Sequence, residues 1–583
     1  MNGKLRPVTN SRIARSIPAK PALLLPLQNA SIVVVSTVGH IRAACPECTK
    51  ESFVAFKLSA SVLEKAIKHL CKYGDTDVFP HLPELAFFRD ESIAIVTELK
   101  ELDLDSYNPG GAFEALAPKS RFGFRITHQL SAVDTVLLLA AVIEIGSLIE
   151  ARRPDAKGLE AFSYRFDSTT DESLFLPNRT FKDWLHAQQS RIQGSLKIKQ
   201  VVLTDISDFY ARINFHRLEN LLDEAAPANG AAKYIKKVIK VIRAKQSFGL
   251  PVGGTAARLL AELALSDTDK ALIDHGIVAT RFVDDFRIFL SAGDNPYDVL
   301  SFLAQQLSIN EGLSLNAAKT RVMSRTAYLE TLKGLTSDIS EEAEGEALET
   351  LTADIYFEES PDPEDVEALK ALNLLGFLQE EIGKEDYDAG RIKVIFRALK
   401  IAKPPDAIEY IVANFSELVV FAKEVSLLMQ ALEEEAPGCF NDLTESVIAA
   451  ILEPPASSVQ LIRTWLLELF VRGTVPIAAF QFKQIESLSS LLDKRQLHII
   501  RSRTNNKHFF RMNKAAVGQI PPFEQPAFIS GAVCLPKDEY ENWLATLKPI
   551  FSGPTCHLFL KWAKANKEKV IAKLGASIDE HIE

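Results

Sequence analysis

Two adjacent carboxylates, Asp284 and Asp285, stand inside a run of strand-forming residues, RFVDDFRIFL (281–290). Buried carboxylates are costly unless they are paired, hydrogen-bonded or bound to a metal ion. Two of them about 4 Å apart repel by roughly 4 kcal/mol at an effective dielectric constant near 20. A divalent cation removes that repulsion. The alternative is a tight turn whose aspartates face water, so the choice depends on partners elsewhere in the chain.

A third carboxylate, Asp205, ends another predicted strand in VVLTDISDFYARI (201–213). Val201, Leu203 and Asp205 alternate onto one face of that strand. If the strand lies beside the 281–290 segment, Asp205 meets Asp284 and the pair can hold two cations, as phosphoryl transfer requires. Asp208 has a simpler alternative role, which is to cap the helix that follows.

Two further segments complete an ordered set. GLPVGG (249–254) supplies glycines that let the backbone approach a ligand, with Pro251 stiffening the turn before a helix. Lys319 follows a short predicted strand and can protonate or neutralise a departing pyrophosphate. Taken singly, these segments are also typical of a glycine-rich helix start and of a solvated surface lysine.

The order and spacing of these segments resemble the palm of reverse transcriptases. The resemblance implies DNA synthesis by a two-metal mechanism with Mg²⁺ as the cofactor and Mn²⁺ as a substitute. It assigns catalysis to Asp205, Asp284, Asp285 and Lys319. The implied metal ligands are Asp205, the Ile206 carbonyl, Asp284 and Asp285.

The resemblance also implies the groups that bind the nucleotide. Tyr210 lies five residues after Asp205, where a bulky ring would clash with a ribose 2′-hydroxyl and select deoxynucleotides. An RNA polymerase would show a smaller or more polar residue there, so RNA synthesis is the weaker alternative. The other implied nucleotide-binding residues are Ile206, Arg125, Arg165, Gly249, Pro251 and Gly253.

Upstream segments such as PKSRFGFRITHQLSAVD (118–134) resemble the prokaryotic defence-associated reverse transcriptases, the Abi-like and DRT group. That resemblance implies antiphage defence by abortive infection, a bacterial cytoplasmic location, and dNTPs and single-stranded DNA as partners. It also implies template-independent, protein-primed synthesis in a trimer or hexamer. Two alternatives stay open. One is a template-copying enzyme that uses a noncoding RNA, and the other is a decayed polymerase that acts as a scaffold.

The fold class expected is an α+β reverse-transcriptase fingers and palm domain followed by an all-α, HEAT-like helical-repeat domain. Residues 1–340 carry a net charge of +3 and residues 341–583 carry −13, from 41 Lys+Arg against 38 Asp+Glu and from 25 against 38. The predicted parts are an N-terminal extension (1–60), fingers (61–198), palm (199–338), an acidic linker (339–367) and a helical-repeat domain (368–583).

One basic segment stands out in the acidic second half. KRQLHIIRSRTNNKHFFRMNK (494–514) holds seven Lys or Arg and no acid. Cations interleaved with phenylalanines suit single-stranded nucleic acid, although an exposed solvated loop would show the same composition. The predicted nucleic-acid path consists of Arg501, Arg503, Lys507, Phe509, Phe510 and Arg511.

The six cysteines are too few and too scattered for a disulfide framework. Cys45 and Cys48 form half of a zinc site, but Cys71, His40 and His69 lie at spacings that match no common zinc pattern. The most apolar segment, residues 133–149, contains two acids and is predicted to be a core helix rather than a membrane span, so no membrane partner is expected.

Overall fold

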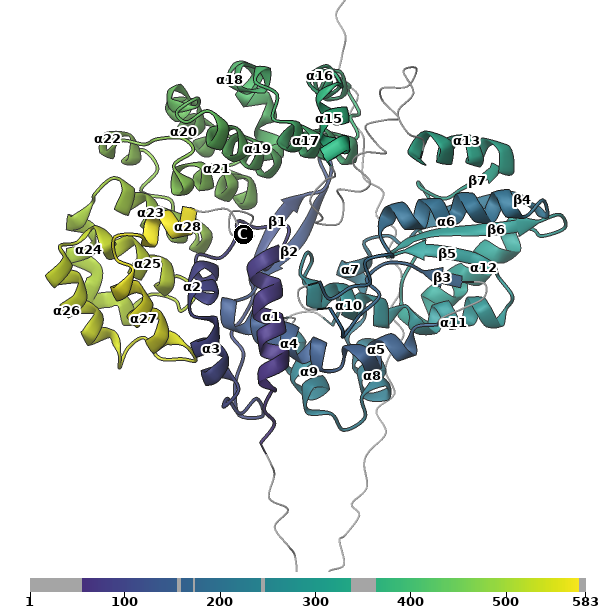
Figure 1. The fold of residues 1–583 in the computed structure, drawn as a ribbon, viewed down its shortest axis with the longest axis horizontal. Helices are drawn as coiled ribbons and strands as arrows, with labels where there is room; N and C mark the ends of the chain where they lie inside the picture. The colour runs from purple at the N-terminus through teal and green to yellow at the C-terminus, as the bar shows by residue number, and fades with distance from the viewer. Residues whose placement is uncertain (1–54, 155–158, 171–172, 243–246, 337–362, 576–583) are drawn as a thin grey trace, which may run out of the picture. The chain divides into compact units, whose positions relative to one another are not determined.

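The predicted catalytic strands lie in one five-stranded sheet of the computed structural model (Figure 1). The structure describes residues 55–154, 159–170, 173–242, 247–336 and 363–575. The strand order is β3–β5–β6–β4–β7. The strands are β3 (Leu159–Ala161), β4 (Ile198–Asp205), β5 (Ala279–Phe282), β6 (Asp285–Ser291) and β7 (Arg321–Ser324).

Strand β4 lies between β6 and β7 and is antiparallel to both. Lys199 and Gln200 near its start are exposed, and every residue from Val201 to Asp205 is buried because both faces are covered there. Val201 and Leu203 face a cluster that includes Trp184 and Tyr328, from helices α6 and α13. Val202 faces the opposite way, into the large core of the domain.

Helices therefore cover both faces of the sheet. In Figure 1, α6 and α13 lie on one side and α11 and α12 on the other. The helices of this part are α6 (Phe181–Gly194), α7 (Phe209–Arg212), α8 (Phe215–Ala225), α9 (Gly230–Ile242), α10 (Thr255–Ala264), α11 (Ser266–Asp274), α12 (Pro296–Gln306) and α13 (Arg325–Thr336).

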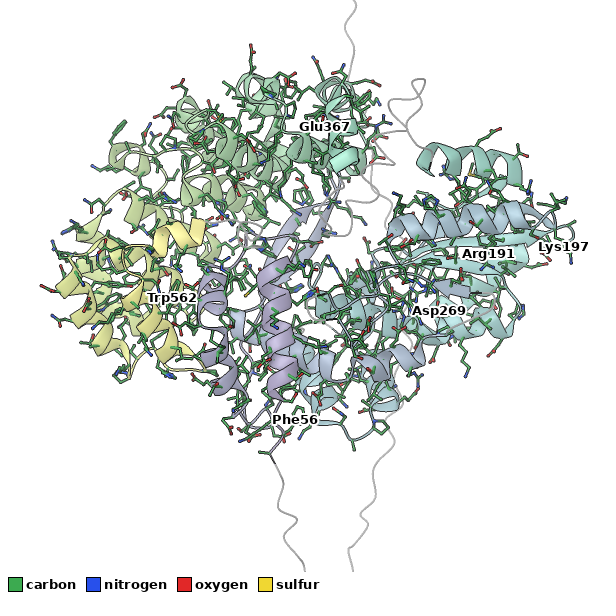
Figure 2. The ribbon with its side chains drawn as sticks, viewed as in Figure 1. Phe56, Arg191, Lys197, Asp269, Glu367 and Trp562 are labelled. Atoms are coloured by element: carbon green, nitrogen blue, oxygen red, sulfur yellow. The ribbon has the colours of Figure 1, made fainter. Side chains whose placement is uncertain are left out.

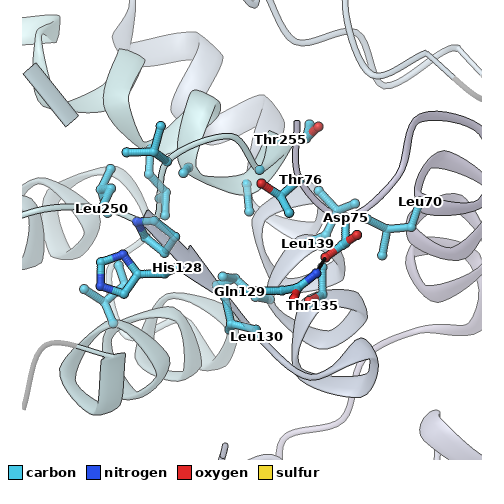
Figure 3. Close-up of a pocket in the computed structure, with 18 residues that line it drawn as sticks. Leu70, Asp75, Thr76, His128, Gln129, Leu130, Thr135, Leu139, Leu250 and Thr255 are labelled. Carbon is cyan, nitrogen blue, oxygen red and sulfur yellow. Dashed lines mark hydrogen bonds between the residues drawn. The ribbon is translucent and has the colours of Figure 1, made fainter. Parts of the chain in front are cut away.

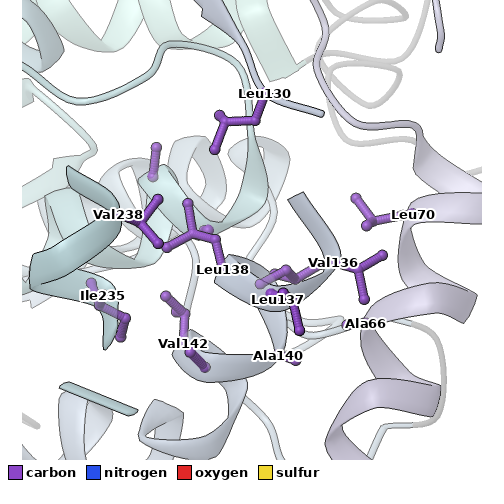
Figure 4. Close-up of a cluster of buried hydrophobic side chains, with 14 of the residues drawn as sticks. Ala66, Leu70, Leu130, Val136, Leu137, Leu138, Ala140, Val142, Ile235 and Val238 are labelled. Carbon is purple, nitrogen blue, oxygen red and sulfur yellow. The ribbon is translucent and has the colours of Figure 1, made fainter. Parts of the chain in front are cut away.

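The apolar segment predicted as a core helix forms two helices, α4 (Ala132–Glu144) and α5 (Gly146–Arg152). Almost all of α4 is buried, and its side chains meet those of α1 (Ala60–Tyr73) and α9 (Figure 4). Among the described residues no single helix is long and apolar enough to cross a membrane, while the α4–α5 pair, bent by 53°, meets the length and composition requirement.

A separate two-stranded hairpin precedes α4. Its strands, β1 (Phe113–Pro118) and β2 (Phe124–Gln129), are antiparallel. One face, with Ala115 and Ala117, is buried against the helical second half of the chain. The other face leaves Leu116 and Ile126 exposed by 46% and 41%. Two short helices, α2 (Glu84–Asp90) and α3 (Ser92–Leu99), also lie in this part.

Residues 363–575 are all-helical where the structure describes them, as the sequence predicted. Helices α17, α19, α21, α23 and α25 pack each against the next, in chain order. The helices are α15 (Pro363–Lys370), α16 (Leu374–Ile382), α17 (Ala389–Ala402), α18 (Asp406–Leu418), α19 (Ala422–Glu435), α20 (Thr444–Leu452), α21 (Gln460–Arg472), α22 (Ala479–Phe482), α23 (Leu491–Arg503), α24 (Lys507–Asn513), α25 (Gln525–Gly531), α26 (Lys537–Leu547), α27 (Cys556–Ala565) and α28 (Val570–Gly575).

The last helices pack on α2 through Trp562, which is fully buried (Figure 2). Its ring contacts Phe87 and Phe559, and its indole N–H donates to Asp90 Oδ2 at 2.7 Å.

We expect Trp562→Ala to lower the free energy of unfolding by about 3–5 kcal/mol, because the removal of a large aromatic ring leaves a cavity. Urea denaturation measures this. Trp562→Phe keeps most of the packing and should cost less than half as much; equal losses would contradict the cavity explanation.

Candidate active site

The end of the sheet brings the three predicted carboxylates together. Asp205, the last residue of β4, lies directly opposite Asp285, the first residue of β6. The backbone N–H of Ile206 donates to the carbonyl of Asp284 at 3.2 Å. The pairing of β4 with β6 thus places residues 79 positions apart in sequence at one sheet edge.

The turn between β5 and β6 consists of Val283 and Asp284. Val283 has a φ of 53°, in the left-handed region. A β-branched residue rarely adopts this conformation, and such strain costs on the order of 1–3 kcal/mol. The turn projects Asp284 beside Asp285 at the cost of a strained backbone, so its surroundings must hold it.

Electrostatic repulsion at this edge is strong. The pKa of Asp284 is raised to about 7, first by burial and then by the charges of Asp285 and Asp205. Asp205 Oδ1 is buried and accepts no hydrogen bond in the structure. Carboxylate oxygens, one of them buried without a hydrogen-bond partner, are the type of ligand that Mg²⁺ prefers, so the residue types fit the metal that the reverse-transcriptase resemblance implies.

Two cations offset part of the negative charge. Lys319 Nζ lies 2.5 Å from Asp205 Oδ2, and Arg287 Nη1 lies 3.5 Å from Asp285 Oδ1. Burial lowers the pKa of Lys319, but the contact with Asp205 outweighs it and the net shift is upward. Lys319 is therefore protonated and points at the carboxylates. Within the described residues no three His, Cys, Asp or Glu side chains are arranged as a metal site.

Tyr210 follows the carboxylate strand and packs against the core. Burial raises the pKa of its phenol, and the nearby Tyr164 and Asp284 raise it further, which Arg258 opposes. The phenol is thus neutral and lies within electrostatic reach of Asp284. This is the neighbourhood that the sugar-gate prediction requires, although a role in selection stays a prediction.

The glycine-rich loop is joined to the backbone around Tyr210. The N–H of Gly249 donates to Ile213 at 2.7 Å, and that of Leu250 donates to Tyr210 at 2.8 Å. Gly253 has a φ of 99°, and a Cβ there would lie 2.2 Å from Asp77 Oδ1. The loop therefore needs glycine at 253 both for its backbone conformation and for the close approach of the 75–79 segment.

A small cavity lies behind this loop, between α1, α4 and β2 (Figure 3). Its volume is about 40 Å³, which is room for a few water molecules. At its edge Gln129 Nε2 donates to Asp75 Oδ2 at 2.9 Å. The cavity is too small for a nucleotide. Pro251 lines it and packs against the other lining side chains there.

The structure treats the two predicted fingers arginines differently. Arg165 Nε pairs with Glu150 Oε1 at 2.5 Å, so its guanidinium has an internal partner, and its contact with a triphosphate stays a prediction. Arg125 lies on β2 opposite Ala117, and its Nε is buried without a hydrogen-bond partner. Lys393 of α17 lies nearby, which no sequence pattern indicated. Its pKa is lowered by burial and by the charge of Arg125, against the effect of Glu424.

A further contact was not predicted. Lys119, in the turn of the β1–β2 hairpin, bonds Asp208 Oδ1 at 2.8 Å. Asp208 has a φ of 48° and makes no side-chain cap to α7, so the capping alternative is wrong. The basic turn KSRFG (119–123) was the available signal. The contact ties the hairpin to the segment that follows Asp205.

The basic segment 494–514 is largely engaged within the fold, which corrects the predicted nucleic-acid path. Phe510 is fully buried in the core and cannot stack on a base. Arg501 is 7% exposed and lies over the Phe509 ring at 3.9 Å. Arg503 donates to the carbonyls of Val471 and Arg472, and Arg511 pairs with Glu539. Arg501 and Arg503 thus contact neighbouring helices, whereas the ion pair of Arg511 lies at the surface. Cys45 and Cys48 lie outside the described residues.

Residues 156–357 match the reverse transcriptase (RNA-dependent DNA polymerase) family. Solved structures with a similar fold include apo telomerase from Candida tropicalis, 13% identical over 65% of this chain and 74% of that chain, with a TM-score of 0.32. Telomerase from Candida albicans in complex with a TWJ fragment of telomeric RNA is 12% identical, over 62% and 66%, with a TM-score of 0.28. These likenesses are too distant to bear on function. No curated protein matches the chain. The chain therefore contains a reverse transcriptase domain, and by that family it is an RNA-directed DNA polymerase.

Proposed function

We propose that this protein polymerises dNTPs at the edge formed by β4 and β6. The observation that carries the proposal is the meeting of Asp205, Asp284 and Asp285, with Lys319 bonded to Asp205. Phosphoryl transfer needs positioned charge more than covalent chemistry, and this edge concentrates carboxylates beside a protonated lysine.

Asp205, Asp284, Asp285 and the Ile206 carbonyl would hold Mg²⁺, or Mn²⁺ in its place. When bound, the metal neutralises phosphate charge and makes the 3′-hydroxyl a better nucleophile. Lys319 keeps its proton at neutral pH and stabilises the negative charge that develops on the pyrophosphate. Arg125 would bind a phosphate oxygen, and the absence of a hydrogen-bond partner for its buried Nε supports this role.

The biological setting is proposed from the resemblance to the defence-associated group. We assign the protein to antiphage defence in the bacterial cytoplasm, acting by abortive infection as a trimer or hexamer. The helices from α15 to α25 would form a HEAT-like array that guides single-stranded DNA product. In this mode synthesis needs no template and begins on a tyrosine of the protein itself.

A second mode, in which the enzyme copies an RNA, is favoured by the family that residues 156–357 match. One experiment separates the two. Purified protein is incubated with each labelled dNTP and Mg²⁺, with and without an added RNA of defined sequence, and products are sequenced and run on gels before and after protease. Product without RNA that shifts after protease supports the first mode. Product whose sequence follows the RNA supports the second.

Absence of any polymer with either RNA or dNTP mixtures would end the polymerase proposal and leave a scaffold. The scaffold alternative predicts that phage protection survives Asp284→Asn in cells, whereas the polymerase proposal predicts its loss. Immunoblotting of the variant controls for the amount of protein.

A further inference from the structure

A group of buried charges lies beneath the β5–β6 turn and takes no direct part in the proposed chemistry. Arg281 and Asp269 have no exposed surface, and Glu262 and Arg153 expose 1% and 3% (Figure 2 labels Asp269). Buried ion networks contribute little net stability, because desolvation offsets their attraction. A role in fixing a conformation accounts for their presence better than a role in stability.

Arg281 is the centre of the group. Its Nε and Nη2 donate to the two carboxylate oxygens of Asp269 at 2.7 and 2.5 Å, and Nη2 lies 2.8 Å from Glu262 Oε2. Its remaining nitrogen, Nη1, donates to the carbonyl of Val283 at 3.0 Å. Two carboxylates therefore hold the guanidinium rigidly, and the guanidinium holds one side of the turn.

Ser163 holds the other side. Its Oγ accepts the N–H of Val283 at 2.8 Å and donates to Glu262 Oε1. Its own carbonyl accepts from Arg153 Nη2 at 2.7 Å, and the same nitrogen lies 2.8 Å from Glu262 Oε2. Both backbone polar groups of Val283 are thus bonded to one buried network.

The hydrogen bonds with Ser163 and Arg281 restrain Val283, the residue with the strained backbone. Val283 adopts a φ of 53°, and a valine released from its partners returns to the extended or right-handed region. Such a rotation would swing the following carboxylates, Asp284 and Asp285, away from Asp205. Strained residues persist only where their surroundings fix them, and the surroundings here are Ser163 and Arg281.

We propose that Ser163 and Arg281 are positioning residues, which hold Val283 in its left-handed conformation so that Asp284 and Asp285 face Asp205. The inference rests on the proposed polymerase function and adds residues from outside the catalytic set. In this proposal the network does not contact the substrate. It determines the direction in which the side chains of Asp284 and Asp285 point.

Ser163→Ala tests the proposal with the smallest change, since only the hydroxyl oxygen is lost. We expect kcat for dNTP incorporation to fall about 10- to 100-fold, as misplaced catalytic groups do, with KM for dNTP changed less than twofold. Mn²⁺ binding, followed by electron paramagnetic resonance without substrate, should weaken at least about fivefold by the same displacement.

Ser426→Ala is the matched control. Ser426 is also fully buried and also hydrogen-bonded through its hydroxyl, which donates to the carbonyl of Trp465 at 3.0 Å, but it lies in the helical region and contacts none of the carboxylates. It should leave kcat and Mn²⁺ binding unchanged. Should Ser163→Ala fail to fold, Ser163→Cys, of similar volume but a weak hydrogen-bonding group, takes its place with the same expected result.

Wild-type kcat and Mn²⁺ affinity in a folded Ser163 variant would overturn the proposal, as would an equal loss in Ser426→Ala. Failure of the polymerase function itself looks different. Wild-type protein would then make no DNA, while the Mn²⁺ measurement would still report whether Ser163 positions the carboxylates.

Discussion

Asp284→Asn is expected to reduce dNTP incorporation by about 10³-fold or more, because it removes a charged ligand from the site that stabilises the triphosphate. Asp284 lies at the strained turn, next to Asp285, which pairs with Asp205 across the two strands. Asparagine has nearly the same shape, so the fold should be kept. Single-turnover incorporation of a labelled dNTP measures the change.

The same substitution should stabilise the metal-free protein at neutral and alkaline pH. The folded pKa of Asp284, about 7, lies above its ordinary value of 3.8. Between these values the folded state binds more protons than the unfolded state, so stability falls as pH rises from about 4 to about 7. Asparagine removes that loss, which is on the order of 4 kcal/mol at pH 8 because each pKa unit corresponds to about 1.4 kcal/mol.

Thermal unfolding in EDTA at pH 5 and pH 8 measures this effect. Asp284→Asn should melt higher than wild type at pH 8, with a smaller difference at pH 5. Mg²⁺ should raise the melting temperature of wild type more than that of the variant. Asp274→Asn, at an exposed position at the end of α11, removes the same charge and serves as the control. It should change neither the melting temperature at pH 8 nor the stabilisation by Mg²⁺. Retained activity in Asp284→Asn would contradict the catalytic assignment.

Tyr210→Ala is expected to raise ribonucleotide incorporation relative to deoxynucleotide incorporation by about 10²-fold, as expected when a steric clash of a few kcal/mol is removed. The ring lies near Asp284, packs against the core and contacts the Phe209 ring, while the backbone carbonyl of Tyr210 accepts from Leu250 N–H. Its rigidity matters because a mobile ring could not exclude a hydroxyl. The ratio of kcat/KM for rNTP and dNTP is the measurement.

Tyr210→Phe separates the ring from the phenol. Because the exclusion is steric, the phenylalanine variant should keep the wild-type ratio, while both variants should keep similar thermal stability within about 2 kcal/mol. A ratio that changes equally in both would assign selection to the hydroxyl. An unchanged ratio in Tyr210→Ala would remove this residue from sugar selection.

Strand character, spacing and residue type were sufficient to predict that Asp205, Asp284 and Asp285 meet at one edge of the sheet. The alternation of residues in β4 places Asp205 on the same strand face as Val201 and Leu203. The apolar run around Asp284 predicts the strand that lies beside β4. The reverse-transcriptase family and the all-helical second half also follow from local patterns. These features depend on residues close in sequence, or on an order of motifs that a family retains.

The partners of each charge were decided by tertiary structure alone. The sequence suggests that Arg165 and Arg501 bind phosphate or nucleic acid. In the structure Arg165 forms an ion pair with Glu150, and Arg501 lies over the Phe509 ring. Conversely, Ser163 and Arg281 carry no motif, but the packing of β3 and α10 against β5 brings them to the turn at Val283. The residue type alone determines whether a side chain can carry a charge. Its partner depends on the fold, which joins Ser163 to Val283 across 120 residues, and burial, which only the fold sets, determines how strongly each contact acts.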